Sequence, residues 1–319
     1  MAIFFLMVGL EIKRELVEGE LSSPKKALLP ILCAVGGAII PAAIYYAANY
    51  GKPTSSGWGI PMATDIAFAL AVITMLGKKA PASLKIFLAA LAIVDDLMAI
   101  LVIAIFYSSQ LDFAYLMYAG SVFVLLLVFN RLKVKNILFY VIPGIFMWYF
   151  IHNSGIHATI AGVLTALALP TTPDSTESPL EKLEHILVKP VNFIIIPIFA
   201  LANTNIHIES QMFEGLFSSL GIGILLGLLL GKPAGIMLVS WLSVRLGLCK
   251  LPANSGWVHI LGVGLLGGIG FTMSIFISLL SFSDPTLIAE AKFSILVASL
   301  LSGIIGYGIL RMNSKKIRQ

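Results

Sequence analysis

Two adjacent carboxylates, Asp95 and Asp96, lie in the middle of a strongly apolar stretch, residues 84–107. An ionisable group at bilayer depth costs roughly 2.5–3.5 kcal/mol on the insertion scale, so a chain retains it for a partner or for function. Adjacent residues of a helix point about 100° apart, so the two side chains cannot face one partner squarely. We therefore expect the pair to take part in ion chemistry and its two members to have different roles.

Two further ionisable residues interrupt apolar segments. Asp65 follows Thr64 in the segment Ile60-Pro-Met-Ala-Thr-Asp-Ile-Ala-Phe, and Lys232 stands in Leu230-Gly-Lys-Pro233. Lys232 alone is equally well explained by a buried ion pair that stabilises helix packing. One lysine cannot neutralise three carboxylates, however, so at least one acid must be protonated or bind a cation. Coupled carboxylates suit exchange of protons for a cation, and carboxyl and hydroxyl oxygens are hard donors that favour alkali or alkaline-earth cations.

The composition requires a membrane environment for these groups. Of the 319 residues, 58% are hydrophobic and 12% are charged, whereas soluble domains are about 25% charged. At about 20 residues per span, the apolar segments predict an all-α membrane protein with about eleven transmembrane helices in one polytopic domain, residues 1–319. They lie near residues 1–10, 27–50, 60–77, 84–107, 113–130, 136–152, 156–170, 186–204, 216–243, 257–281 and 289–311.

The cations are distributed very unevenly between the loops. Of the 21 Lys and Arg residues, 18 fall in one set of alternate loops and in the C-terminal tail. The positive-inside rule makes that side cytoplasmic, together with the C-terminus. The net charge of +5 does not indicate nucleic-acid binding, because no Lys/Arg cluster alternates with aromatic residues.

Two segments carry signs of a broken helix. One is 61–65, where Pro61 precedes Thr64 and Asp65; the other is the glycine run 262–270. Irregular backbone at membrane depth is tolerated where it lines a cavity or is buried in protein, although small residues also allow close helix packing. The segments occupy matching places in two three-helix units, residues 27–107 and 216–311, which start in opposite orientations. We expect an inverted repeat whose interrupted helices cross near the midplane, with Asp65 offsetting half-helix N-termini and Lys232 offsetting C-termini.

Several motifs together are similar to the NhaA family of bacterial sodium/proton antiporters. They are Gly9-Leu-Glu-Ile-Lys-Arg-Glu15, Ala63-Thr-Asp-Ile-Ala-Phe-Ala-Leu70, the stretch from Leu84 to Leu97 that ends in Val-Asp-Asp-Leu, Gly231-Lys-Pro233, and Gly267-Gly-Ile-Gly-Phe-Thr-Met-Ser-Ile-Phe276. The resemblance spans essentially the whole chain. Inverted repeats with interrupted helices are a known feature of this family, so the repeat pattern is not independent support.

The resemblance implies a secondary antiporter rather than an enzyme, with no catalytic residues and no cofactor. It would exchange cytoplasmic Na⁺ or Li⁺ for external H⁺, electrogenically and with activation by pH, in the bacterial inner membrane. Asp96 would be the main Na⁺ ligand and proton carrier, and Asp95 its partner, paired with Lys232. Thr64 and Asp65 would lie at the helix crossing. The cytoplasmic cluster associated with pH activation would comprise Glu11, Arg14, Glu15, Glu184 and His185.

The resemblance implies a departure from the family pattern at the start of the sequence: we expect residue 1 to fall within the family's second helix, without the first helix and the hairpin that follows it. The resemblance implies a homodimer, weakened if that hairpin is absent. Three other interpretations remain open. A cation-coupled symporter would need an organic-substrate pocket; an intramembrane aspartyl protease would pair Asp65 with Asp95 but lacks its Gly-x-Gly-Asp pattern; and the chain could be a transport-dead fragment.

Overall fold

The computed structural model describes residues 1–108, 111–171, 178–206 and 210–313, and every regular element in these ranges is helical. The predicted all-α class is confirmed. The chain divides into two compact units: residues 1–23 with 100–202, and residues 24–99 with 203–319. Both predicted repeat units fall almost entirely in the second, and the prediction of one polytopic domain stays a prediction.

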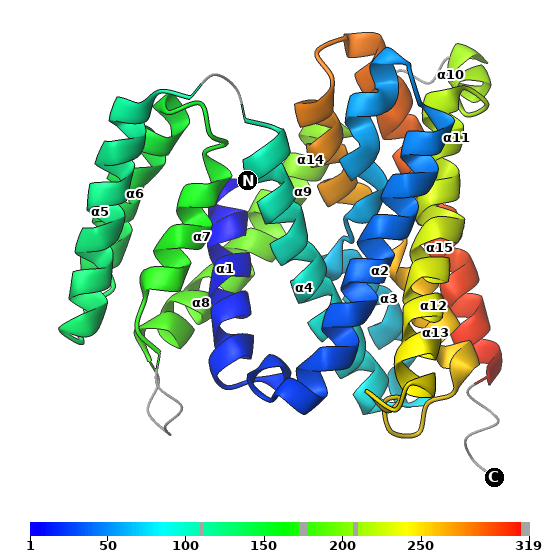
Figure 1. Ribbon diagram of the computed structural model, residues 1–319, viewed down its shortest axis with the longest axis horizontal. Helices are drawn as coiled ribbons and strands as arrows, with labels where there is room; N and C mark the ends of the chain where they lie inside the picture. The colour runs from blue at the N-terminus through cyan, green and yellow to red at the C-terminus, as the bar shows by residue number, and fades with distance from the viewer. Residues whose placement is uncertain (109–110, 172–177, 207–209, 314–319) are drawn as a thin grey trace. The chain divides into compact units, whose positions relative to one another are not determined.

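The first unit contains a helical layer built around α1 (Figure 1). Helix α1 packs against α7 and α8, and α6 packs against both α5 and α7. Lys13 of α1 donates to the carbonyl oxygens of Leu167 and Leu169 at the end of α7, 2.6 and 2.5 Å away. The unit's elements are α1 (Ala2–Val17), the short 3-10 turn η1 (Glu20–Ser22), residues 100–106 of α4 (Ala82–Phe106), α5 (Phe113–Arg131), α6 (Leu138–Asn153), α7 (Thr159–Ala168), α8 (Pro179–Pro190), the π turn η4 (Val191–Ile195) and residues 196–202 of α9 (Ile196–Asn203).

The second unit is centred on α2 and α12, which lie side by side (Figure 1). Gly36 and Gly235 bring the two backbones together, since a Cβ on Gly36 would lie 2.8 Å from the carbonyl oxygen of Gly235. The unit's helices are α2 (Pro24–Ala48), the 3-10 helix η2 (Pro53–Met62), α3 (Ile66–Met75), η3 (Gly77–Lys79), residues 82–99 of α4 (Ala82–Phe106), α10 (Ser210–Gly215), α11 (Ser219–Leu226), the π turn η5 (Gly227–Gly231), α12 (Lys232–Arg245), α13 (Trp257–Gly267), α14 (Phe271–Ser281) and α15 (Pro285–Asn313).

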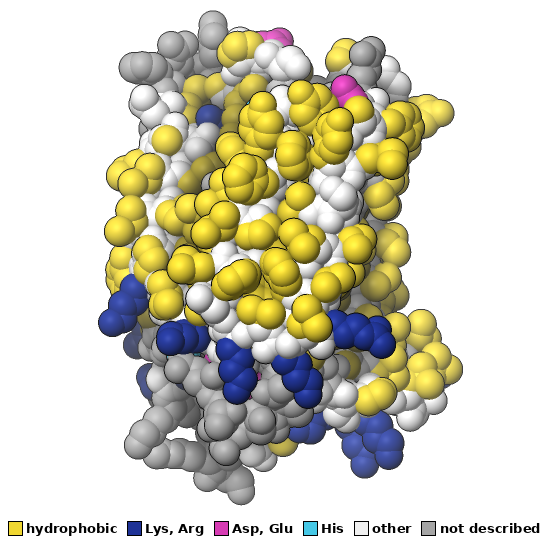
Figure 2. All heavy atoms as spheres, turned by 90° about the vertical axis from the view of Figure 1, so that its left-hand side faces the viewer, with side chains coloured by type: hydrophobic (Ala, Val, Ile, Leu, Met, Phe, Trp, Pro, Cys, Tyr) yellow, Lys and Arg dark blue, Asp and Glu magenta, His cyan; other side chains and the backbone are white. Residues whose placement is uncertain are grey.

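Many of these helices suit a bilayer. In the described part of the chain, six helical segments are long and apolar enough to cross a membrane, and two bent helix pairs meet the same test. On the face drawn in Figure 2, apolar side chains form a broad band and most of the visible Lys and Arg side chains lie along one edge. The predicted spans near 1–10, 136–152 and 156–170 coincide with α1, α6 and α7, which have 10 to 16 residues. The protein is a multi-pass helical membrane protein, and the number eleven stays a prediction.

The two bent pairs are the interrupted helices that the sequence predicted. The pair η2 and α3 bends by 41°, and the pair α13 and α14 bends by 46°. Pro61 lies inside η2, and the chain is extended at Ala63 and Asp65 before α3 begins. The second break falls at residues 268–270, between α13 and α14.

The π turn η5 was not predicted from the sequence. It stands in the helical segment Ser219–Arg245 and ends one residue before Lys232. Glycines at its two ends allow close contact with α2 and η2: a Cβ on Gly231 would lie 2.8 Å from Cα of Pro41, and one on Gly227 would lie 2.6 Å from Cβ of Pro61. Single π turns inside α-helices are frequent at functional sites.

Candidate functional site

The two helix breaks meet and complete each other's hydrogen bonding. The Asp65 N–H donates to the carbonyl of Ile269, 2.7 Å away, and the Thr64 hydroxyl oxygen lies 2.7 Å from the carbonyl oxygen of Gly267. A third contact joins the same two pairs: the Ser274 hydroxyl of α14 donates to the carbonyl of Ile60 in η2 at 2.7 Å. Each interruption thus supplies partners for backbone groups that the other leaves outside its helix, which is how broken helices are tolerated at membrane depth.

The glycine run serves both purposes that the sequence left open. Gly268 and Gly270 flank the break itself. Gly262 and Gly264, by contrast, are packing positions, since a Cβ on Gly264 would lie 2.8 Å from Cα of Pro233 in α12, and one on Gly262 would lie 2.6 Å from the side chain of Leu310 in α15. Interruption and close packing therefore occur within one nine-residue stretch.

Asp65 caps the N-termini of both half-helices. Its Oδ1 accepts from the N–H of Phe68 in α3 at 3.2 Å, and its Oδ2 accepts from the N–H of Thr272 in α14 at 3.0 Å as well as from the Thr272 hydroxyl. A helix N-terminus carries a partial positive charge and unsatisfied N–H groups. A single buried carboxylate here faces two such termini.

Lys232 lies beside the C-terminal ends of the two first half-helices, η2 and α13. It is fully buried, and its Nζ is 2.6 Å from Oδ2 of Asp95. The same ammonium donates to the carbonyl of Met62, the last residue of η2. A Cβ on Gly267, the last residue of α13, would lie 3.8 Å from the Lys232 side chain. The cation thus stands beside the C-terminal, partially negative ends of both first half-helices.

Oxygen atoms gather around Asp95. Its Oδ2 is 2.7 Å from the Thr64 hydroxyl oxygen, which is equally close to the Gly267 carbonyl. Because a hydroxyl has one hydrogen, Thr64 can donate to only one of these two acceptors at a time. The other oxygen of Asp95, Oδ1, is buried and accepts no hydrogen bond from the described residues. Carboxylate, hydroxyl and carbonyl oxygens in one buried place form a hard-donor set suited to an alkali cation.

Asp96 is 1% exposed and follows Asp95 on α4. The ion pair of Lys232 is made with Asp95, so the two adjacent acids differ in their electrostatic surroundings. The structure therefore brings Thr64, Asp65, Asp95 and Lys232 together at the crossing. It also buries Asp96, the residue that follows Asp95 on α4.

A cluster of charged side chains lies in the first unit, between α1 and α8. Arg14 forms ion pairs with Glu184 at 3.0 Å and with Glu15 at 3.6 Å. Burial, the largest cause, and the carboxylates of Glu184 and Glu15 together raise the pKa of Glu11, which follows the apolar residues 1–10, to about 7, and Arg14 opposes them. His185 is exposed and adjoins Glu184 on α8. All five residues of the predicted cluster lie on these two helices, which pack together.

The sequence did not identify several contributors to the site. Thr272 supplies both a hydroxyl and an N–H to Asp65, and its only signal was its place in the Gly267–Phe276 motif. The other contributors, from Met62, Gly267 and Ile269, are backbone carbonyls, which any residue type provides. Their involvement depends on where each helix ends.

Interrupted helices that meet at buried charges define the class: an ion-coupled secondary transporter, of which NhaA is a known example. The model of the family Na⁺/H⁺ antiporter 1 matches residues 1–310. The chain therefore belongs to this family, and the family identity supports sodium/proton exchange.

Curated relatives agree over nearly the whole chain. It is 66% identical to Na(+)/H(+) antiporter NhaA 2 of Flavobacterium johnsoniae, over 99% of this chain and 78% of the relative. It is 54% identical to the NhaA antiporter of Dechloromonas aromatica (96% and 80%) and 48% identical to that of Brucella ovis (100% and 82%). These relatives are named as transporters and not as enzymes.

Proposed function

We propose that this protein exchanges cytoplasmic Na⁺ or Li⁺ for external H⁺ in an electrogenic, pH-activated cycle, and so serves sodium and pH homeostasis. The observation that carries the proposal is the pair Asp95 and Asp96: two adjacent buried carboxylates with one buried ammonium, which pairs with Asp95. Such a site cannot hold all its acids ionised without a cation.

In the proposed cycle, Asp96 is the main Na⁺ ligand and proton carrier. The ion is also bound by Asp95 and by the hydroxyl of Thr64, which already lies 2.7 Å from the Asp95 carboxylate. As Na⁺ binds Asp95, it competes with Lys232 for the same carboxylate and releases that ion pair. Asp65 remains on Thr272 and Phe68 and holds the two half-helices together by their N-termini.

Electrogenic exchange follows if one cation displaces two protons. Each cycle then moves net charge, and an inside-negative membrane potential favours proton entry by about 2.3 kcal/mol per charge per 100 mV. The cation-rich loops support an inner-membrane protein with a cytoplasmic C-terminus. The cluster of Glu11, Arg14, Glu15 and Glu184 then faces the cytoplasm, where ionisation of Glu11 near pH 7 is suited to report the internal pH.

The test of the ion site is Na⁺-induced proton movement in proteoliposomes that contain the full chain. Asp96→Asn keeps the shape of the side chain but cannot carry a proton, and we expect it to abolish the exchange signal with both Na⁺ and Li⁺. The matched control is Asp112→Asn, an exposed carboxylate that caps α5 and should leave exchange unchanged. An exchange signal that survives in Asp96→Asn would reject the site assignment.

The same preparation separates the remaining alternatives. A parent protein with no signal under any condition would favour the transport-dead fragment. A potassium-diffusion potential, negative inside, should accelerate Na⁺ efflux; a rate independent of potential would reject the electrogenic cycle. For the protease alternative, the acids that would share a proton are engaged elsewhere: Asp65 with Thr272 and Phe68, and Asp95 with Lys232 and Thr64.

A further inference from the structure

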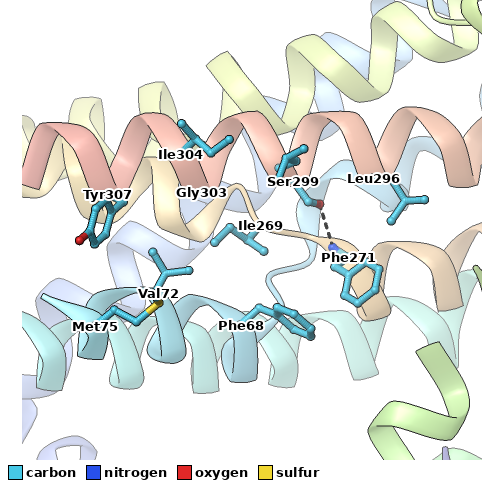
Figure 3. A pocket seen from close by; sticks show the side chains of 11 residues that line it. Phe68, Val72, Met75, Ile269, Phe271, Leu296, Ser299, Gly303, Ile304 and Tyr307 are labelled. Carbon is cyan, nitrogen blue, oxygen red and sulfur yellow. Dashed lines mark hydrogen bonds between the residues drawn. The ribbon is translucent and has the colours of Figure 1, made fainter. Parts of the chain in front are cut away.

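An apolar groove lies in the second unit, beside the helix crossing. Figure 3 shows it between α3 and α15, with Ile269 and Phe271 of the second break at its inner side. Its volume is about 420 Å³, within the range of sites that bind small molecules. The lining is apolar apart from the Ser299 hydroxyl, which accepts from the N–H of Phe271 at 3.1 Å, and the phenol of Tyr307.

The open side of the groove is apolar, as expected of a surface that faces lipid. Met75, Leu300 and Ile304 line it and are 75%, 65% and 59% exposed. Helix α15 and the bent pair that includes α3 are both long and apolar enough to cross a membrane. Apart from the Ser299 and Tyr307 hydroxyls the lining offers water no favourable partner, so hydrocarbon is the matching occupant.

The length of the groove fits one leaflet. It runs along α15 from Leu296 to Tyr307, which is about 16 Å at 1.5 Å per residue. Half of a hydrocarbon core that is about 30 Å thick is about 15 Å. A single acyl chain of a phospholipid would therefore lie along the groove from the headgroup level to the middle of the bilayer.

The charges at one end select the headgroup. Tyr307 and Met75 lie at the same end of the groove in Figure 3, and the Arg311 guanidinium is 6.0 Å from the Tyr307 ring centroid. On the other wall, Lys79 follows Met75 by four residues, and Lys85 donates to the carbonyl of Gly77 at 3.1 Å. The three cations Arg311, Lys79 and Lys85 favour an anionic headgroup at this end of the groove.

We propose that this groove binds one acyl chain of an anionic glycerophospholipid of the surrounding bilayer, with the phosphate near Arg311 and the chain against the helix crossing. At its inner end the chain contacts Phe68 and Phe271, whose rings meet edge to face at 4.9 Å. Phe68 is the residue whose N–H Asp65 caps. The lipid thus touches both half-helices that Asp65 joins. The binding does not depend on the proposed exchange activity.

The proposal is tested with a variant that fills the groove and leaves Asp65, Asp95, Asp96 and Lys232 unchanged. Gly303 lines the groove, and a Cβ there would meet Ile269 at an ordinary 3.4 Å, so Gly303→Phe should place its ring in the cavity. Gly308→Phe is the matched control, because it lies on the same helix and nothing lies within 4 Å of its Cβ position. Native mass spectrometry of the full chain in detergent, titrated with dioleoyl phosphatidylglycerol, measures the binding of the first lipid.

We expect Gly303→Phe to weaken that binding by about tenfold or more, since displacing even two methylene groups from an apolar site has this effect. Gly308→Phe should bind as the parent does. Arg311→Gln should weaken phosphatidylglycerol binding by about fivefold and leave dioleoyl phosphatidylcholine binding unchanged, whereas the control Arg245→Gln should change neither.

Equal binding by Gly303→Phe and the parent, or equal affinity of the parent for the two lipids, would overturn the proposal. If Gly303→Phe does not fold, Ile304→Asn replaces it, with Ile305→Asn as its control on the same helix; Ile304 lines the groove and Ile305 does not. The binding readout needs no transport, so a failure here is distinguishable from a failure of the exchange proposal.

Discussion

Breaking the buried ion pair between Lys232 and Asp95 should be strongly destabilising. Lys232→Met retains most of the side-chain volume but removes the ammonium that lies 2.6 Å from Asp95 and also serves the Met62 carbonyl. Leaving one charge of such a pair buried and uncompensated costs about 3–5 kcal/mol. For a chain of this size we expect the melting temperature to fall on the order of 10 °C.

The pairwise part of this loss is measurable by a double-mutant cycle. Melting in detergent is compared for the parent, Lys232→Met, Asp95→Asn and the double variant. Since Asp95→Asn removes the charge that Lys232→Met would strand, the double variant should be more stable than the summed single losses predict, by about 1–3 kcal/mol. Lys250→Met, an exposed lysine of the same unit, should change stability by about 0.5 kcal/mol or less. Strictly additive losses would refute the ion pair as the source of the effect.

Two further predictions concern Glu11 and Asp65. The pKa of Glu11 rises from 4.5 in the unfolded chain to about 7. Between these two values the folded protein binds more protons than the unfolded chain, so its free energy of unfolding decreases as pH rises. Glu11→Gln should therefore flatten the profile of melting temperature against pH between pH 5 and pH 8, and an unchanged slope would contradict this. Asp65→Ala removes caps from two helices and should cost about 1–4 kcal/mol, at 0.5–2 kcal/mol per cap. Asp112→Ala, which uncaps only α5, should cost about half as much, and equal losses would argue against the double cap.

The location of the site could be predicted from the sequence because charge is rare at bilayer depth. Asp65, Asp95, Asp96 and Lys232 are conspicuous in apolar segments, and the structure buries all four. The positions of the helix breaks were likewise indicated by Pro61 before a polar pair and by clustered glycines, since both weaken a helix locally.

The contacts that join these groups could not be predicted in the same way. Which carbonyl meets Lys232 depends on η2 ending at Met62, and helix boundaries are the least certain part of a sequence-based assignment. The role of Thr272 depends on Asp65 reaching across to α14, a separation of 207 residues along the chain. No local pattern encodes such a contact. The π turn η5 also leaves no distinct signal in an apolar, leucine-rich segment.

That π turn has a consequence for the angular phase of the helix that contains Lys232. One residue of an α-helix corresponds to a rotation of about 100°, and a π turn adds a residue to a turn. The face that α11 presents to α2 and α15 is therefore set independently of the direction in which Lys232 points. In a strictly α-helical segment both would be fixed by a single phase. The extra residue allows the scaffold helix to keep its packing register while the ammonium is aimed at Asp95, so the two can be altered separately by sequence changes on either side of the turn.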